Sequence, residues 1–496
     1  MHNDEGVNAV KFGELWEHGA YKYDPSEYHG PALPYATALI NRLGGAPDYK
    51  HFTETRLRVV TVLFGAALIL LYPLLCSAVG RKAAIWAGLF TAVSPAMVYY
   101  SRYYIHEMLL IFFTASALVS GWRYWQSRRV GWVAVCGVSL GLMHATKETF
   151  ILTLAAALLA LGLNQFWNRQ LDASGVPARA PRLDLRHIFA GLAAWIVVWL
   201  LLYSSFFTNP RGLIDSLTTY ANWIGRSGKT NPHAHEWWFY FQRLLFFHAD
   251  KGPIWSEVLI FLLALVGAAA GFFRKGLGDG NASFVRFLTF YTVFLTAFYT
   301  LLSYKTPWCL LSFWLGFILL AGVGASVLIN LAKFQWARSA TVLALVVVSA
   351  QLGLQAWQAG VLHASDLRNP YVYSPTSPNL LLLVEKIELL ANVSPEKHAT
   401  VIKVMAPEGD YWPLPWYLRK FDHVGWYDKI PEEPFAPIMV VSAQFHANLD
   451  EKRTHGMREM FELRPGVFFE LYVEAGLWSA YVEALHQADV HTTPRF

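Results

Sequence analysis

Charged residues are scarce in this chain of 496 residues. Only 15% of the chain is Asp, Glu, Lys or Arg, whereas soluble domains carry roughly 25%. The formal net charge of +5 is too small for the basic surface of a nucleic-acid-binding protein, so we expect no nucleic-acid partner. The composition therefore excludes a disordered chain and a typical soluble enzyme.

Cysteine is scarcer still, and its positions favour neither a metal site nor disulfide bonds. The three cysteines, Cys76, Cys136 and Cys309, all lie in apolar runs. This placement argues against a disulfide framework and against a thiolate metal site. A glycine-rich phosphate loop is also missing from the sequence, which argues against a nucleotide-driven pump.

Apolar and aromatic residues are abundant, at 55% and 16%, and they gather in long runs. A membrane span needs about 20 mostly apolar residues, and about ten runs qualify. They occupy residues 57–79, 83–100, 105–125, 130–146, 149–163, 188–206, 254–273, 284–303, 308–331 and 338–357. The mean hydropathy is only +0.31, so a large part of this polytopic α-helical membrane protein must lie in water.

The loops between these runs alternate in charge, which predicts their sidedness. One set of loops carries most of the basic residues, and the positive-inside rule places that set in the cytoplasm. Its members are Arg81, Lys82, Arg123, Arg128, Arg129, Arg169, Arg179, Arg182, Arg186, Arg274, Lys275, Arg286, Lys333 and Arg338. We therefore expect a multi-pass protein of the cell membrane whose other loops and C-terminal tail are extracytoplasmic.

The chain divides into three regions on this interpretation. Residues 1–56 form an outer-side first loop, residues 57–357 the transmembrane bundle with its outer-side loop 207–253, and residues 358–496 an outer-side soluble domain. Predicted strands at 401–406, 437–443 and 468–474 alternate with helices at 379–393 and 476–488, which favours a small α/β domain. An outer-side start without an anchor predicts that one N-terminal span precedes this sequence.

Polar clusters fall mostly in the predicted outer-side segments. Asp4 and Glu5 are adjacent carboxylates suited to general-base work or cation binding, although a polar tail would look similar. His29 follows in a Pro/Gly-rich turn. His233 and His235 form a weak metal motif that could equally be part of an aromatic ledge.

Lone cations at the ends of apolar runs form the second group. Arg102 and Glu107 are either a structural ion pair or a phosphate-binding arginine and a carboxylate that aids the acceptor or a metal. Lys147 either neutralises Glu148 or meets a lipid phosphate as a compact point charge. Lys305 is unexpected on the outer side by the positive-inside bias.

Together these motifs resemble the GT-C membrane glycosyltransferases of the protein O-mannosyltransferase-like type. The resemblance rests on HNDE at 2–5, YDPSEYHGP at 23–31, HATKETF at 144–150, SYKTPW at 303–308 and DYWPLPWYLR at 410–419. It covers nearly the whole chain and is strongest to a flippase-activity-associated archaeal and bacterial branch. Members normally carry a span before the Asp-Glu pair, which this sequence lacks.

The resemblance implies transfer of a hexose or mannose-like sugar from a polyprenyl-phosphate-linked donor, with inversion, on the outer face. It implies that Asp4 is the catalytic base with Glu5 beside it, and that Glu107 orients the acceptor or a divalent cation. Arg102, Lys147 and Lys305 would stabilise the departing phosphate. No cofactor is certain, a divalent cation is a candidate, and the acceptor is a glycan, a lipid or a protein.

A second interpretation is a non-enzymatic component of lipid-linked sugar translocation, in which the outer-side cations hold lipid headgroups without chemistry. An ion-coupled transporter fits poorly, because no pair of broken helices appears in corresponding halves of the chain. Sugar transfer from the lipid-linked donor discriminates between the first two interpretations.

Overall fold

The computed structural model describes residues 1–26, 29–172, 184–227, 233–450 and 454–492. The chain forms two compact units. The larger comprises Glu14–Gly45 and Thr55–Tyr373, and the smaller comprises Met1–Gly13, Ala46–Glu54 and Ser374–Phe496. Helix α1 (Asn3–His18) begins in the smaller unit and ends in the larger one.

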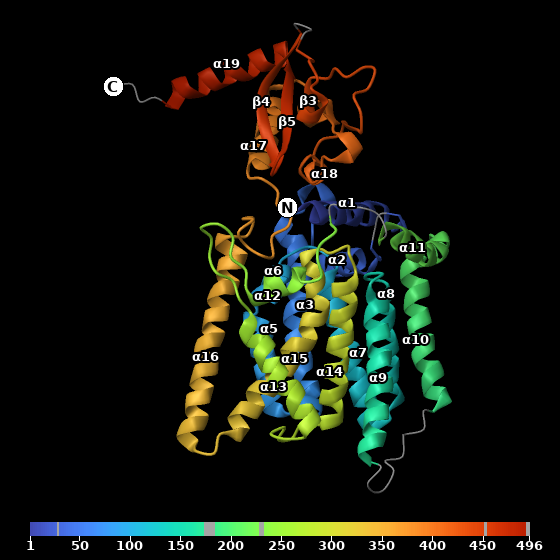
Figure 1. Ribbon diagram of the computed structural model, residues 1–496. Helices are drawn as coiled ribbons and strands as arrows, with labels where there is room; N and C mark the ends of the chain where they lie inside the picture. The colour runs from blue at the N-terminus through green and yellow to red at the C-terminus, as the bar shows by residue number, and fades with distance from the viewer. Residues whose placement is uncertain (27–28, 173–183, 228–232, 451–453, 493–496) are drawn as a thin grey trace. The chain divides into compact units, whose positions relative to one another are not determined.

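The larger unit is a helical bundle (Figure 1). Its helices are α2 (Ala32–Leu43), α3 (Glu54–Leu71), η2 (Tyr72–Leu75), α4 (Cys76–Val79), α5 (Arg81–Val93), α6 (Pro95–Ser101), α7 (Glu107–Ser127), α8 (Val130–His144), α9 (Phe150–Asp172), α10 (Leu185–Tyr203), α11 (Arg211–Ser227), α12 (Phe239–Leu245), α13 (Val258–Phe273), α14 (Ala282–Leu301), η3 (Pro307–Leu310), α15 (Leu311–Leu331), α16 (Gln335–Trp357) and the π-helical turn η4 (Gln358–Leu362). Every apolar run predicted as a span is helical. The protein is therefore a multi-pass helical membrane protein.

Among the described residues, six helices are long and apolar enough to cross a membrane, and α5 with α6 makes a seventh if counted as one span. Helices α8 and α13 are apolar but shorter. The count of about ten spans and the side that each loop faces stay predictions.

The predicted run at 83–100 is not one straight helix, because α5 and α6 meet at an angle of 61°. Pro95 has no N–H to donate and disfavours helical geometry at the residue before it, and Ser94 accordingly adopts an extended conformation with ψ of 119°. The Ser94 hydroxyl then caps α6 by accepting a hydrogen bond from the Met97 N–H. The Ser-Pro pair thus explains the bend.

Helix α15 is the core of the bundle. It packs against α5, α13 and α14, and nearly all of its side chains are buried, as expected of a helix that is apolar on every face. The backbones of α13 and α15 approach each other closely where glycine lies at the contact. A Cβ added at Gly324 would lie 1.9 Å from the Leu263 carbonyl oxygen on α13, so no larger residue fits there. Gly267 on α13 makes the reciprocal approach to α15. Small residues at such contacts are typical of membrane helix packing.

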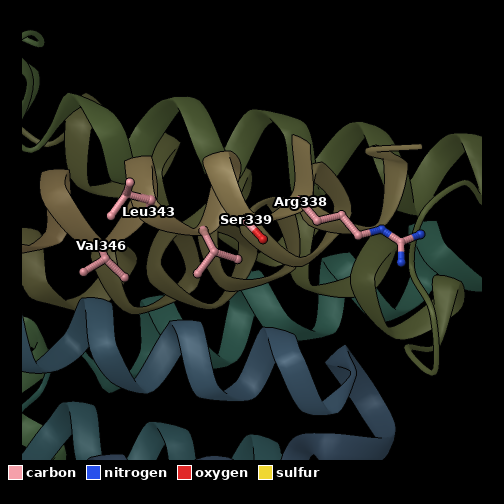
Figure 2. Close-up of a pocket in the computed structure, with 5 residues that line it drawn as sticks. Arg338, Ser339, Leu343 and Val346 are labelled. Atoms are coloured by element: carbon pink, nitrogen blue, oxygen red, sulfur yellow. The ribbon is translucent and has the colours of Figure 1, made fainter. Parts of the chain in front are cut away.

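Helix α16 is more loosely packed. A shallow groove of about 390 Å³ runs along it, with Arg338 at one end and an apolar stripe beyond (Figure 2). Its lining residues are Arg338, Ser339, Val342, Leu343 and Val346. None of the predicted site residues lines this groove.

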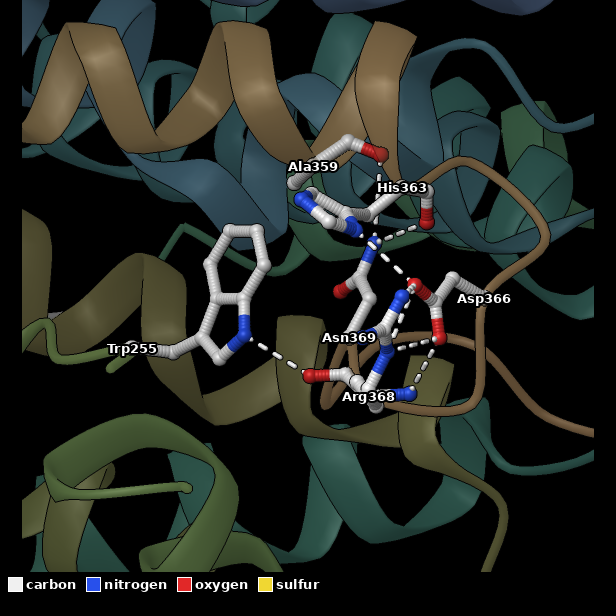
Figure 3. A network of polar contacts seen from close by, with 6 residues as sticks. All are labelled: Trp255, Ala359, His363, Asp366, Arg368 and Asn369. Carbon is white, nitrogen blue, oxygen red and sulfur yellow. Dashed lines mark hydrogen bonds and ion pairs between the residues drawn. The ribbon is translucent and has the colours of Figure 1, made fainter. Parts of the chain in front are cut away.

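The segment after α16 is fixed by a polar network (Figure 3). The Trp255 indole donates a hydrogen bond of 2.8 Å to the Arg368 carbonyl, and the Asn369 amide donates to the carbonyls of Ala359 and His363. The Asp366 carboxylate accepts hydrogen bonds from the Arg368 guanidinium and pairs with the His363 ring. Residues 363–369 are therefore held against the start of α13.

The smaller unit contains a five-stranded sheet of order β2-β1-β3-β5-β4. Its elements after α1 are η1 (Tyr49–His51), α17 (Asn379–Val393), η5 (Lys397–Ala399), β1 (Ile402–Met405), η6 (Pro407–Gly409), α18 (Leu414–Tyr417), β2 (Val424–Tyr427), β3 (Ile438–Ser442), η7 (Ala443–Phe445), β4 (His455–Arg464), β5 (Val467–Glu474) and α19 (Ala475–Thr492). Strand β1 pairs in parallel with β2 and β3, whereas β5 pairs antiparallel with β3 and β4. Helices α17 and α19 pack together and contact β4 and β5.

The predicted α/β domain is thus confirmed in outline. Strands β1, β3 and β5 coincide with the predicted strands, and α17 spans the predicted helix. Strands β2 and β4 were not predicted, because the former is short and contains Gly425 and the latter is rich in charged residues. Both are edge strands, where such residues are typical.

Candidate functional site

Four connections of the larger unit, which we call the polar loops, gather at one end of the bundle. They are residues 101–106, 144–149, 233–235 and 303–309. The Lys147 ammonium pairs with the Glu107 carboxylate at the start of α7 and lies 4.0 Å from the Cys309 sulfur. Ala234 and Tyr304 form an antiparallel bridge that joins connection 233–235 to connection 303–309. Predicted site residues far apart in sequence are therefore brought together.

The Glu107–Lys147 ion pair is buried, with Glu107 3% and Lys147 5% exposed. Glu107 is the first residue of α7, where the helix dipole favours a negative charge. The structure thus gives Lys147 the partner Glu107, whereas the sequence suggested Glu148. Arg102, which the sequence suggested as a partner of Glu107, is exposed and donates a hydrogen bond to the Gly360 carbonyl instead.

Glu148 pairs with His29, through a distance of 2.8 Å between Oε2 and Nδ1. Burial by itself raises the pKa of Glu148, but the charge and hydrogen bond of His29 outweigh it and lower that pKa to about 2. The ring of His106 lies edge-on to that of His29, and the buried Nδ1 of His106 has no hydrogen-bond partner among the described residues. The predicted second-tier residue His29 is therefore part of the polar loops' charge network.

Lys305 is held by carbonyl groups rather than by a carboxylate. Its side chain is buried, and its ammonium donates hydrogen bonds to the carbonyls of His235, at 2.9 Å, and of Leu302. The backbone N–H of Lys305 donates to the His233 carbonyl at 2.9 Å. The two predicted histidines therefore lie beside Lys305. The His233 ring is hydrogen-bonded to the Tyr373 hydroxyl, and the His235 ring stacks on the Phe239 ring with 4.2 Å between the ring centroids.

Arg243 is a cation that sequence reasoning missed. It lies on α12, and its guanidinium sits 3.5 Å from the centroid of the Phe239 ring. Burial lowers the pKa of Arg243 to about 10, and its Nε has no hydrogen-bond partner within the described ranges. Arg243 forms no ion pair with a carboxylate in the part of the chain that the structure describes. It was missed because it lies within the predicted outer-side loop 207–253, away from any recognised motif.

Glu257 is a second missed residue. Its carboxylate is fully buried at the start of α13 and accepts hydrogen bonds from four groups on other segments. The donors are the Ser94 hydroxyl at 2.5 Å, the Ala96 N–H at 3.0 Å, the Trp314 indole at 3.2 Å and the Tyr371 hydroxyl at 2.7 Å. Glu257 therefore ties the α5–α6 bend to α13, α15 and the segment after α16.

Asp4 and Glu5 belong to the smaller unit and differ in environment. The Asp4 side chain is exposed on the first turn of α1, without a hydrogen-bond or ion-pair partner among the described residues. Glu5 is fully buried, and its carboxylate accepts a hydrogen bond of 2.9 Å from the His2 N–H, which caps the start of the helix. Of the two carboxylates, only Asp4 is accessible to a ligand.

A metal site is not evident in the described residues, which contain no group of three His, Cys, Asp or Glu side chains able to hold an ion. The question of a divalent cation stays a prediction. His233 and His235 contact the aromatic rings of Tyr373 and Phe239, and the choice between a metal site and an aromatic ledge stays a prediction.

This chain is similar to a known protein family and to solved membrane-protein structures. Residues 28–178 match the family model described as dolichyl-phosphate-mannose-protein mannosyltransferase. ArnT from Cupriavidus metallidurans bound to undecaprenyl phosphate superposes with a TM-score of 0.61 at 14% identity, over 96% of this chain and 94% of that one. The chain has the GT-C membrane glycosyltransferase fold.

The oligosaccharyltransferase of Archaeoglobus fulgidus, tethered to an acceptor peptide, shares this GT-C fold. It superposes with a TM-score of 0.53 at 12% identity, over 87% of this chain and 60% of that one. No curated protein sequence matches the chain. The predicted resemblance to mannosyltransferase-like GT-C enzymes is confirmed, while the roles of individual site residues stay predictions.

Proposed function

We propose that this protein transfers a hexose from a polyprenyl-phosphate-linked donor to an acceptor on the outer face of the cell membrane, with inversion at the sugar carbon. The proposal is carried by the buried Lys305 and the half-buried Arg243, which lie beside the polar loops of a GT-C fold. Neither cation forms an ion pair with a carboxylate among the described residues. A buried cation without a counter-ion is costly, and a phosphate would supply the missing charge. ArnT, with the same fold, binds undecaprenyl phosphate.

The reaction assigns a separate role to each group. The Asp4 carboxylate accepts the proton of the acceptor hydroxyl, whose oxygen attacks the anomeric carbon of the donor sugar. The bond from that carbon to the phosphate oxygen breaks, and the phosphate leaves with the electron pair. Negative charge grows on the phosphate in the transition state, where fixed cations in a poorly solvated site stabilise it strongly.

The cations differ in their suitability for that task. Lys147 is already neutralised by Glu107, so its ion pair holds the polar loops together and orients the substrates. Lys305 and Arg243 retain net charge for the phosphate, and the exposed Arg102 can meet it at the surface. The partners in this proposal are the lipid-linked sugar, membrane lipids and a glycan, lipid or protein acceptor.

Reconstitution tests the proposal. Proteoliposomes that contain the full chain are supplied with radiolabelled polyprenyl-phosphate mannose and with membrane extract as the source of acceptor. We expect label to move from the lipid donor to a product that resists mild acid. If the labelled lipid is only translocated, with no product, the non-enzymatic alternative is correct and the proposed activity is wrong.

A further inference from the structure

The first turn of α1 packs directly onto residues 410–413 of the same compact unit. A Cβ added at Gly6 would lie 2.6 Å from the Pro413 Cβ, so only glycine allows this approach. The hydroxyl of Thr376 also donates a hydrogen bond of 2.7 Å to the Met1 carbonyl. Two segments some 400 residues apart, each of which carries a motif of the family resemblance, are thus in contact.

Arg464, the last residue of β4, joins these segments by polar contacts. Its guanidinium is 7% exposed, pairs with the Asp410 carboxylate and donates a hydrogen bond of 3.3 Å to the Trp412 carbonyl. The Asn3 amide, in the orientation that satisfies its neighbours, donates to the same carbonyl at 2.9 Å and accepts from Arg464. A planar group with five donors suits such a three-way junction.

The contacts with Arg464 and the Trp412 carbonyl fix the position of Asn3, the residue immediately before Asp4. The Asp4 carboxylate has no hydrogen-bond or ion-pair partner of its own among the described residues, so its position depends on the backbone of the first helical turn. The ion-pair partner of Arg464 is Asp410 rather than Asp4. The contacts therefore constrain where the Asp4 carboxylate lies.

We propose that the C-terminal domain positions the catalytic carboxylate, with Arg464 and Asn3 as positioning residues for Asp4. This inference rests on the proposed function, in which Asp4 is the base. Displacement of a reacting group by about 1 Å lowers the rate on the order of 100-fold. Contacts that fix the start of α1 should therefore raise kcat. Binding of the donor does not depend on it.

Two variants test the inference, and the thermal midpoint of each reports whether the domain keeps its fold. Asn3→Ala removes both amide contacts, and Arg464→Lys keeps the ion pair with Asp410 but loses the junction. We expect kcat for mannosyl transfer to fall at least tenfold in both, with unchanged KM for the polyprenyl-phosphate mannose and an unchanged thermal midpoint. The matched control is Arg458→Lys, on the same strand, where the arginine lies over the Trp478 ring.

A double variant separates positioning from a general loss of activity. If Asn3 acts through Asp4, Asn3→Ala in an Asp4→Asn background has no further effect on kcat. Full kcat in Asn3→Ala and Arg464→Lys, or losses that multiply in the double variant, would overturn the inference while leaving the proposed function intact. Absence of transfer by the wild-type protein would overturn both.

Discussion

At the residue scale, the structure distinguishes cations by what neutralises them. The sequence treats Lys147 and Lys305 alike, as lone lysines at the ends of apolar runs. In the fold, the Lys147 ammonium pairs with the Glu107 carboxylate, whereas the Lys305 ammonium donates hydrogen bonds to carbonyl oxygens and forms no ion pair among the described residues. The free charge therefore lies at Lys305 and Arg243.

Lys305→Gln should weaken stabilisation of the donor phosphate and so slow sugar transfer. Hydrogen bonds to charged groups contribute about 1.5–3 kcal/mol, so we expect kcat/KM for polyprenyl-phosphate mannose to fall roughly 10- to 100-fold. Steady-state kinetics in proteoliposomes measure this. Lys82→Gln is the matched control, because the Lys82 ammonium is exposed and donates to the Asn330 side chain; an equal loss there would refute the assignment.

The His29–Glu148 pair predicts a pH dependence of stability. The pKa of Glu148 is lowered to about 2 in the folded protein, so its ionised form stabilises the fold above the ordinary carboxylate pKa of 4.5. That contribution is lost as pH falls from about 4.5 towards 2. His29→Ala removes the charge and hydrogen bond that do most to lower this pKa, so the variant should lose less stability over this pH range.

Thermal midpoints in detergent between pH 3 and pH 7 measure this effect. Wild-type protein should have the higher midpoint at pH 7, and the two midpoints should converge as the pH falls below about 4.5. A Glu148→Gln variant serves as the control, because His29→Ala should add no pH dependence to it. Parallel midpoint curves for wild-type protein and His29→Ala would show that the pair does not contribute.

At the element scale, the positions of the helices in the bundle could be predicted from the sequence. The bends between helices and the polar contacts that join them could not. Long apolar runs specify helices because backbone groups in lipid must pair within their own segment. Helix α1 was missed because its polar sequence, with Asp4 and Glu5 in the first turn, resembles a solvated tail. Glu257 was missed because a single carboxylate at the start of a run carries no pattern, and its four donors come from distant segments.

Glu257→Ala should strongly destabilise the bundle. It leaves buried donors such as the Trp314 indole and Tyr371 hydroxyl without an acceptor, and each costs about 1–3 kcal/mol. We expect a thermal midpoint in detergent well below that of wild-type protein. Glu385→Ala on α17 is a control whose midpoint should not change, and equal midpoints for both variants would contradict the structural role of Glu257.

At the scale of the whole molecule, residues from both ends of the chain share one compact unit. The sequence indicated an outer-side start and an outer-side tail, and the family resemblance supplied motifs in each. It could not indicate that Gly6 packs on Pro413, because nothing local to either segment encodes a contact over that separation. The number of spans and their sidedness depend on the bilayer and are open to direct measurement.

Cysteine accessibility tests the sidedness. In a variant without Cys76, Cys136 and Cys309, single cysteines at Ser127 and Ser479 probe the two predicted faces. We expect an impermeant maleimide to label Ser479→Cys in intact cells and Ser127→Cys only after permeabilisation. The reverse pattern would place the C-terminal domain in the cytoplasm.

The most direct test of the central claim is the rate of sugar transfer by Asp4→Asn. The amide keeps the size of the side chain and its place in the first turn of α1 but cannot accept the acceptor's proton. With radiolabelled polyprenyl-phosphate mannose and reconstituted full chain, we expect transfer by wild-type protein and a kcat at least 100-fold lower in Asp4→Asn. Equal kcat values for the two proteins would contradict the assignment of Asp4 as the base.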